Sequence, residues 1–107
     1  MKKYDIKDFK NGWIIGNFEP SILKTKNFEV AVLSHPKNQK WPKHYHKLLT
    51  EYNLLLEGKM IINNTEINKN EIFTLEPNEI ADPIFLEDCK VLCIKVPSII
   101  GDKYEIE

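Results

Sequence analysis

The sequence contains no arginine. Its basic residues are fifteen lysines, set against sixteen acidic residues, and the formal net charge is −1. The lysines are scattered along the chain instead of clustered, so a nucleic-acid partner is not expected. The planar guanidinium group that binds phosphates and carboxylates through two parallel hydrogen bonds is missing. A phosphorylated ligand would therefore have to be held by lysine, by backbone amides or by a metal.

The sequence also has no apolar run long enough to span a bilayer. Its first residues are basic, but they run into further charged residues instead of an apolar segment, and no secretory signal is expected. The two cysteines, Cys89 and Cys93, would lie about 13 Å apart on a strand, too far for a disulfide between them. These absences predict a cytoplasmic protein with reduced core thiols and no membrane contact.

Short apolar runs separated by proline, glycine and asparagine turn signals fill the sequence. They recur about every ten residues, which is typical of an all-β sandwich or barrel, and no segment of helical length shows clear helical periodicity. At 107 residues the chain is expected to form a single domain, residues 1–107, with the first dozen residues as an arm. The expected strands span residues 13–18, 28–33, 41–45, 51–56, 59–62, 65–67, 72–75, 80–86 and 91–96.

His44, His46 and Glu51 form the most informative group of side chains. On an extended segment His44 and His46 point to the same face, about 7 Å apart. The four residues that separate His46 from Glu51 are a common length for a hairpin that returns the next strand beside the first. Two imidazole nitrogens and one carboxylate oxygen would then converge and leave positions for water or a substrate. Such a ligand set suits divalent Fe, Mn, Ni, Co, Cu or Zn.

The pattern His44-x-His46-x4-Glu51-x6-Gly58 resembles the first sequence motif of the cupin superfamily. The resemblance covers about residues 27–97, and it favours strand over helix for the leucine-rich segment after Glu51. It implies an all-β, cupin-like double-stranded β-helix, a jelly-roll barrel that holds one divalent transition metal on the two histidines and the glutamate. The superfamily includes dioxygenases, isomerases, epimerases, decarboxylases and non-enzymatic binders, so the resemblance implies the fold more narrowly than the activity.

Residues 70–82 are similar to the second cupin motif but match it poorly. Asn70 and Asn78 stand where the family has glycine, and asparagine tolerates the left-handed conformation that glycine adopts. In that register the family's fourth ligand, commonly histidine, falls on Ala81. Asp82 follows directly, and a bulge beside the next proline would turn its carboxylate inward. We favour Asp82 as the residue that points into the cavity.

Two acidic side chains near this motif are candidate catalytic residues. Asp82, if turned inward, would be either a fourth metal ligand or a nearby acid or base. Glu79 is a polar residue in the otherwise apolar approach to it. Lys95 lies in an apolar run and could face the cavity, but an outward, solvated position is favoured. His35 is expected at the rim of the barrel.

These residues predict a small metal-dependent cupin enzyme. It would act on an oxygen-bearing small molecule such as a sugar, hydroxy-acid or keto-acid, as an isomerase or dioxygenase, with Asp82 or Glu79 moving the proton. The alternative is a non-catalytic module that binds a metal and a small ligand, because a second motif without its histidine is compatible with lost chemistry. A homodimer is expected, since small barrels often pair by adding an N-terminal strand to a neighbour's sheet.

Overall fold

Short strands make up most of the regular structure of the computed structural model, which describes residues 1–106. Within these residues the helical segments are two single turns of 3₁₀ helix, η1 (Ile6–Asp8) and η2 (Lys10–Gly12), and none is long and apolar enough to cross a membrane. The all-β class expected from the sequence is confirmed. The strands are β1 (Trp13–Gly16), β2 (Leu23–Lys24), β3 (Glu29–His35), β4 (His44–Tyr45), β5 (Thr50–Glu57), β6 (Lys59–Ile62), β7 (Thr65–Asn68), β8 (Ile72–Leu75), β9 (Pro83–Phe85), β10 (Cys89–Val96) and β11 (Tyr104–Glu105).

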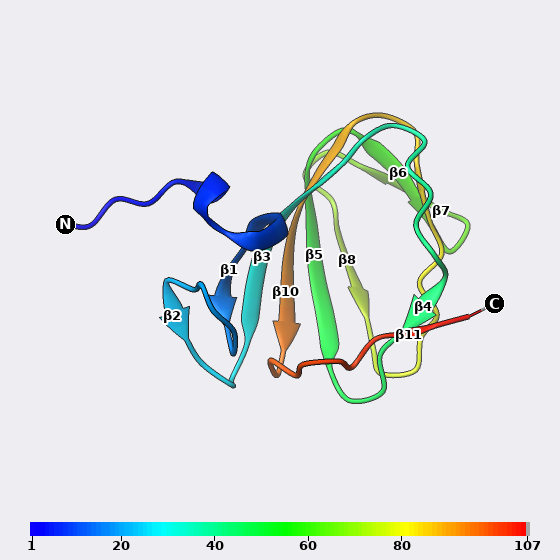
Figure 1. Ribbon diagram of the computed structural model, residues 1–107. Helices are drawn as coiled ribbons and strands as arrows, with labels where there is room; N and C mark the ends of the chain where they lie inside the picture. The colour runs from blue at the N-terminus through cyan, green and yellow to red at the C-terminus, as the bar shows by residue number, and fades with distance from the viewer. Residues whose placement is uncertain (107) are drawn as a thin grey trace.

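One large sheet faces two small ones across the interior (Figure 1). The six-stranded sheet has the order β2-β1-β3-β10-β5-β8, the three-stranded sheet has the order β7-β6-β9, and β4 pairs with β11. Neighbours in the large sheet come from distant parts of the chain, as β10 lies between β3 and β5. This order wraps the chain into two facing layers, so residues far apart in sequence meet inside.

The interior changes from apolar to polar along the barrel. On β5 the buried residues run from Leu55 in the core through Asn53 to Glu51. Strand β10 follows the same gradient and ends near Lys95, whose register partner is Glu51. The polar end of the barrel therefore carries the candidate site. The apolar core reaches this site at Ala81, which bridges to His44, and it is formed by Leu55, Met60, Ile62, Ile67, Leu75, Ala81, Phe85, Cys89 and Val91.

Asparagines take the left-handed turn positions that glycine often occupies. Asn70 and Asn78 both have φ of 72°, as their place in the second motif predicted. Asn63 and Asn64, with φ of 50° and 65°, form the tight turn of the expected hairpin between β6 and β7. Asparagine thus supplies the left-handed positions that the resemblance assigned to glycine.

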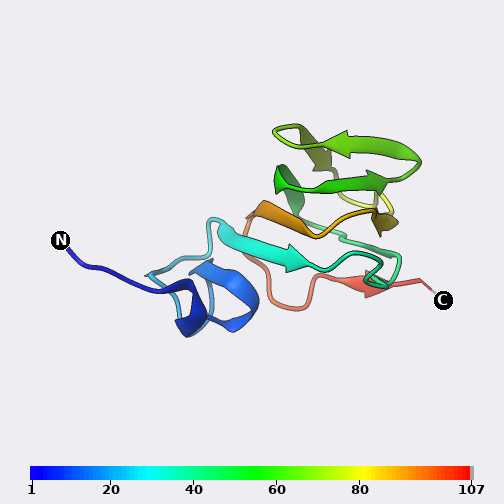
Figure 2. The ribbon, with the colours of Figure 1, turned by 90° about the horizontal axis from the view of Figure 1, so that it is seen from above.

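The N-terminal segment packs against β3 before the chain enters β1. Gly12 lies so close to this strand that a Cβ there would be 2.0 Å from the carbonyl oxygen of Val32. Ile6 and Phe9 from the same segment line the larger cavity of the barrel. The residues before η1 extend away from the barrel (Figure 2). Part of the expected arm is therefore a wall of the interior.

Gly58, the last residue of the first motif, is expected to tolerate no side chain. Its φ is +94°, and an added Cβ would lie 2.4 Å from the Asp88 carbonyl oxygen and 2.9 Å from Cys89 Sγ. Gly58→Ala should lower the free energy of unfolding by about 3 kcal/mol, from backbone strain and the steric clash together. Gly101 also has a positive φ, +80°, but open space around it. Gly101→Ala should therefore cost only about 1 kcal/mol in urea denaturation, and equal losses in the two variants would contradict this account.

Candidate metal centre

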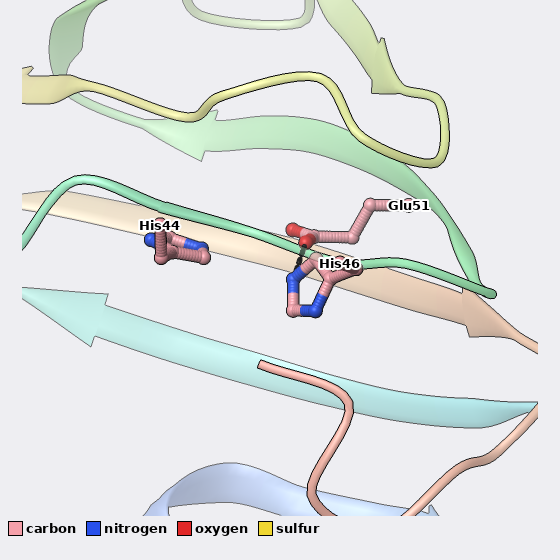
Figure 3. A group of neighbouring side chains, drawn as sticks. All are labelled: His44, His46 and Glu51. Atoms are coloured by element: carbon pink, nitrogen blue, oxygen red, sulfur yellow. Dashed lines mark ion pairs between the residues drawn. The ribbon is translucent and has the colours of Figure 1, made fainter. Parts of the chain in front are cut away.

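His44, His46 and Glu51 converge at the polar end of the barrel (Figure 3). The three residues are buried, at 7%, 4% and 8% exposure, and their ligand atoms lie within 4.8 Å of one another. His44 opens β4, His46 follows that strand, and Glu51 lies on β5 in the facing sheet. The structure thus brings together the three residues that the sequence singled out.

The chain between His46 and Glu51 takes a different route from the expected one. β4 pairs with β11 and bridges to Ala81, whereas β5 pairs with β10 and β8. The intervening residues carry the chain from one sheet to the facing sheet, so the side chains meet across the interior. The expected hairpin is wrong. A connection of this length can also join strands of two facing sheets, and the number of residues between His46 and Glu51 does not identify the strand that pairs with β4.

Asp102 holds this connection in place. Its buried carboxylate accepts hydrogen bonds from the backbone N–H groups of Lys47, Leu48 and Leu49, at 3.0, 3.0 and 3.1 Å. Burial alone would raise the pKa of Asp102, but these three donors and the nearby His46 lower it, so the group is ionised at neutral pH. The sequence analysis missed Asp102, because its partners lie 53 to 55 residues away and no local pattern joins them.

Both imidazoles are oriented by backbone carbonyl oxygens. His44 Nδ1 lies 3.0 Å from the Pro42 oxygen, and His46 Nδ1 contacts the Asp102 oxygen. A carbonyl oxygen only accepts hydrogen bonds, so each Nδ1 carries the hydrogen and each Nε2 offers a lone pair when the ring is neutral. Burial lowers the pKa of His44, which favours the neutral ring. This orientation is typical of histidines that bind a metal.

One carboxylate oxygen of Glu51 is held and the other has no hydrogen-bond partner. Oε1 accepts from the Asn53 amide at 3.3 Å and from the Cys93 thiol at 3.5 Å. Oε2 lies 2.9 Å from His46 Nε2, the contact drawn as a dashed line in Figure 3. Burial alone would raise the pKa of Glu51, but His46, Lys95 and Asn53 lower it to about 2. Glu51 is therefore a carboxylate at neutral pH.

The contact between His46 Nε2 and Glu51 Oε2 fits a shared cation. Both atoms are buried, and neither forms a hydrogen bond with any of residues 1–106. With His46 protonated, the two atoms form an ion pair at 2.9 Å. With the ring neutral, two lone pairs face each other and repel, and a metal between them would satisfy both. Two ligand atoms that each lie about 2.1 Å from one ion, with a ligand–metal–ligand angle of about 90°, are about 3 Å apart. The residues present therefore fit a divalent transition metal.

Asp82 and Glu79 lie outside this group. The Asp82 side chain is 48% exposed, with its carboxylate 3.9 Å from Lys43 Nζ. Ala81 is instead the buried residue, at 2% exposure, and it bridges to His44. Because neighbouring residues of an extended segment face opposite ways, the expectation that Asp82 points inward as a ligand or catalytic group is wrong. Exposed Glu79 accepts a hydrogen bond from the Glu76 N–H at 3.1 Å and closes a turn, so its expected catalytic role is not supported either.

Two cavities adjoin the centre. The larger, of about 780 Å³, is lined by His44 and Glu51, and the smaller, of about 360 Å³, by His46. His35, expected at the rim, is a buried part of the larger cavity's wall, with its ring stacked on Phe85 at 4.3 Å between centroids. Lys95, expected to point outward, lines both cavities. A small molecule in either cavity would lie next to the three converging side chains.

Asp102→Ala is expected to loosen the centre and destabilise the fold. The substitution leaves three N–H groups near His46 without their acceptor, which should lower the free energy of unfolding by about 2 to 4 kcal/mol and metal affinity by about tenfold or more. Urea denaturation and a chelator-competition titration measure the two effects. Asp88→Ala, which removes an exposed carboxylate that accepts one N–H from Lys37, is the matched control and should leave metal affinity unchanged. Equal metal affinity in both variants would contradict the role of Asp102.

No family model matches the sequence, and no curated protein matches it either. Several solved structures do. An uncharacterised conserved protein with a double-stranded β-helix domain from Klebsiella pneumoniae subsp. pneumoniae is similar over 99% of this chain and 92% of that chain, with a TM-score of 0.72 and 15% identity. An RmlC-like cupin protein from Ralstonia eutropha is similar over 78% of this chain and 58% of that chain, with a TM-score of 0.60 and 13% identity.

A bacterial pirin from Escherichia coli, solved in complex with nickel(II), is also similar. The likeness covers 82% of this chain but only 39% of the pirin chain, with a TM-score of 0.67 and 11% identity. At such identities the likeness concerns the fold. The chain has the cupin fold, a double-stranded β-helix, as the first motif implied.

Proposed function

We propose that this protein is a small metal-dependent enzyme that acts on an oxygen-bearing small molecule. His44, His46 and Glu51 would hold one divalent transition metal. The observation that carries the proposal is the pair of buried atoms without a hydrogen bond, His46 Nε2 and Glu51 Oε2, 2.9 Å apart beside two cavities. When bound, such a metal supplies Lewis-acid polarisation of a substrate oxygen, or activation of dioxygen if it is iron.

The arrangement of the chain supports an enzyme over a purely structural metal site. Structural sites are generally closed by four protein ligands, whereas three side chains converge here. The cupin register assigns the fourth ligand position to Ala81, which has no ligand atom in its side chain. The cavity beside them is lined largely by apolar and aromatic side chains, which exclude water from a bound substrate. Both isomerase and dioxygenase chemistry fit such an open site.

Glu29 is the buried carboxyl group that could move a proton in place of Asp82 or Glu79. It lines the smaller cavity together with His46, and it accepts a hydrogen bond from the Ser98 hydroxyl at 3.1 Å. Burial raises the pKa of Glu29, which suits a group that both takes up and releases a proton. An isomerase would need such a group, whereas a dioxygenase needs it less.

The proposal is tested by turnover. The protein is loaded in turn with Fe(II), Mn, Ni, Co, Cu or Zn, incubated with hydroxy-acids, keto-acids and sugars, and the small molecules are followed by proton NMR. We expect one metal to support conversion by the parent and by Glu79→Gln, and none to support it in Glu51→Gln. A ligand that binds to the metal-loaded protein and is recovered unchanged would favour the alternative, a binding module. Conversion that persists in Glu51→Gln would contradict the proposal.

The expected homodimer and the cytoplasmic location stay proposals. Residues 1–5 extend away from the barrel, a position from which they could reach a neighbouring subunit (Figure 2). Sedimentation velocity should give a dimer for the full chain and a monomer for a variant that lacks residues 1–5. A full chain that sediments as a monomer at all concentrations would contradict the dimer.

A further inference from the structure

Each of the two tryptophans of the chain holds a lysine ammonium group over its ring. Lys95 Nζ lies 4.9 Å from the ring centroid of Trp13, and Lys103 Nζ lies 4.6 Å from that of Trp41. Both lysines line both cavities beside the candidate metal centre. A cation over an indole face is attracted by the ring, so the two ammonium groups are held at the cavities instead of swinging into solvent.

Neither ammonium group is paired with a carboxylate among residues 1–106. Both ammonium groups belong to residues that line the same two cavities, and burial followed by the positive charge of Lys95 lowers the pKa of Lys103. Two like charges that face one space are stabilised when an anion lies between them. The lysine ion pairs in the described chain join Lys24 to Glu19, Lys43 to Asp82 and Lys59 to Glu66.

Most of the other side chains that line the larger cavity are apolar, and the polar ones include Asn11, Ser34, Gln39 and Asn53. Trp41, Phe73 and Phe85 contribute aromatic surface, and Met60 and Leu75 contribute aliphatic surface. A sugar carries a hydroxyl on nearly every carbon, and the hydroxyls that face this aromatic and aliphatic surface would lose their water without gaining partners. An apolar chain or ring would instead bury its surface there.

We propose that the ligand of this site is a small carboxylic acid with an apolar body, whose carboxylate binds between the ammonium groups of Lys95 and Lys103. This inference rests on the proposed function, and it selects the hydroxy- and keto-acids over the sugars. The apolar body lies against Trp41 and Phe85 in the larger cavity. A divalent ion at Glu51 would offset that carboxylate's charge, which strengthens the attraction of the site for an anion.

The experiment compares 4-methyl-2-oxopentanoate with its uncharged methyl ester. Both are titrated into the zinc-loaded protein by calorimetry and by tryptophan fluorescence, which reports on Trp13 and Trp41. We expect the acid to bind at least about tenfold more tightly than the ester. Lys95→Met and Lys103→Met should each lower the affinity for the acid about tenfold. Lys90→Met, an exposed lysine on the outward face of β10, is the matched control and should bind like the parent. Added salt should lower the affinity for the acid and leave the affinity for the ester unchanged.

The outcomes separate this inference from the proposed function. Two results would overturn the carboxylate site and leave the metal centre standing, provided that zinc binds normally. One is equal affinity for the acid and the ester, and the other is an affinity for the acid that neither lysine substitution changes. Lysine-dependent binding of the acid to a protein that takes up no metal overturns the metal centre and leaves the carboxylate site standing. If circular dichroism shows that a lysine variant is unfolded, the comparison of acid with ester and the salt dependence in the parent decide alone.

Discussion

Replacing His44 and His46 together by alanine is expected to abolish stoichiometric binding of divalent transition metals. The substitution removes both imidazole nitrogens, and a single carboxylate at Glu51 is too weak a ligand set to retain an ion through dialysis. The loss of stability should be modest, about 1 to 2 kcal/mol, because neither histidine belongs to the apolar core cluster. Elemental analysis of the dialysed, metal-loaded protein measures the first effect, and urea denaturation measures the second.

His35 supplies the matched control for this double variant. It is the third histidine of the sequence, buried at 8% exposure in the wall of the same cavity. Its Nδ1 lies 2.7 Å from the Gln39 side-chain oxygen, and its ring is stacked on Phe85. His35→Gln should therefore keep the full metal content. Full metal content in the double variant, or loss of metal in His35→Gln, would refute the assignment of ligands.

Ala81→His is expected to tighten metal binding about tenfold or more. Ala81 and His44 exchange backbone hydrogen bonds of 2.7 and 3.1 Å, and the side chain of Ala81 lines the larger cavity. A histidine at Ala81 would have the cavity to occupy and would place a third imidazole beside the other ligands. Competition with a chelator of known affinity measures the change.

Asp82→Asn is the companion to this variant. The Asp82 carboxylate is half-exposed and faces Lys43, and an exposed ion pair of this kind contributes little to stability. The asparagine variant should bind metal as the parent does. Weaker metal binding in Asp82→Asn combined with no gain in Ala81→His would show that Asp82 reaches the metal after all.

The sequence predicted those features that depend on local chemistry. The turn asparagines, Asn70 and Asn78, were assigned correctly, because few residue types other than glycine adopt a left-handed backbone without strain. His44 and His46 were expected on one side of an extended segment, and both are buried beside Glu51, as the first motif implied. The short apolar runs between turn signals likewise predicted the all-β class.

Features that depend on contacts between distant segments could not be predicted from the sequence. Strand partners could not be assigned from spacing, so the path from His46 to Glu51 was predicted as a hairpin instead of a crossing between sheets. The direction of Asp82 depended on one residue of register, and a single step moves a side chain to the other face. Asp102 and Lys103 come from a C-terminal segment that reaches the centre only through the folded chain.

X-ray absorption at the zinc edge of the zinc-loaded protein tests the central claim most directly. If His44, His46 and Glu51 hold the metal, the spectrum should show only nitrogen and oxygen neighbours at about 2.0 to 2.2 Å, with the outer-shell scattering of two imidazole rings. A sulfur neighbour at about 2.3 Å, from one of the buried thiols, would contradict the assignment. So would a spectrum that is identical in the His44→Ala/His46→Ala variant.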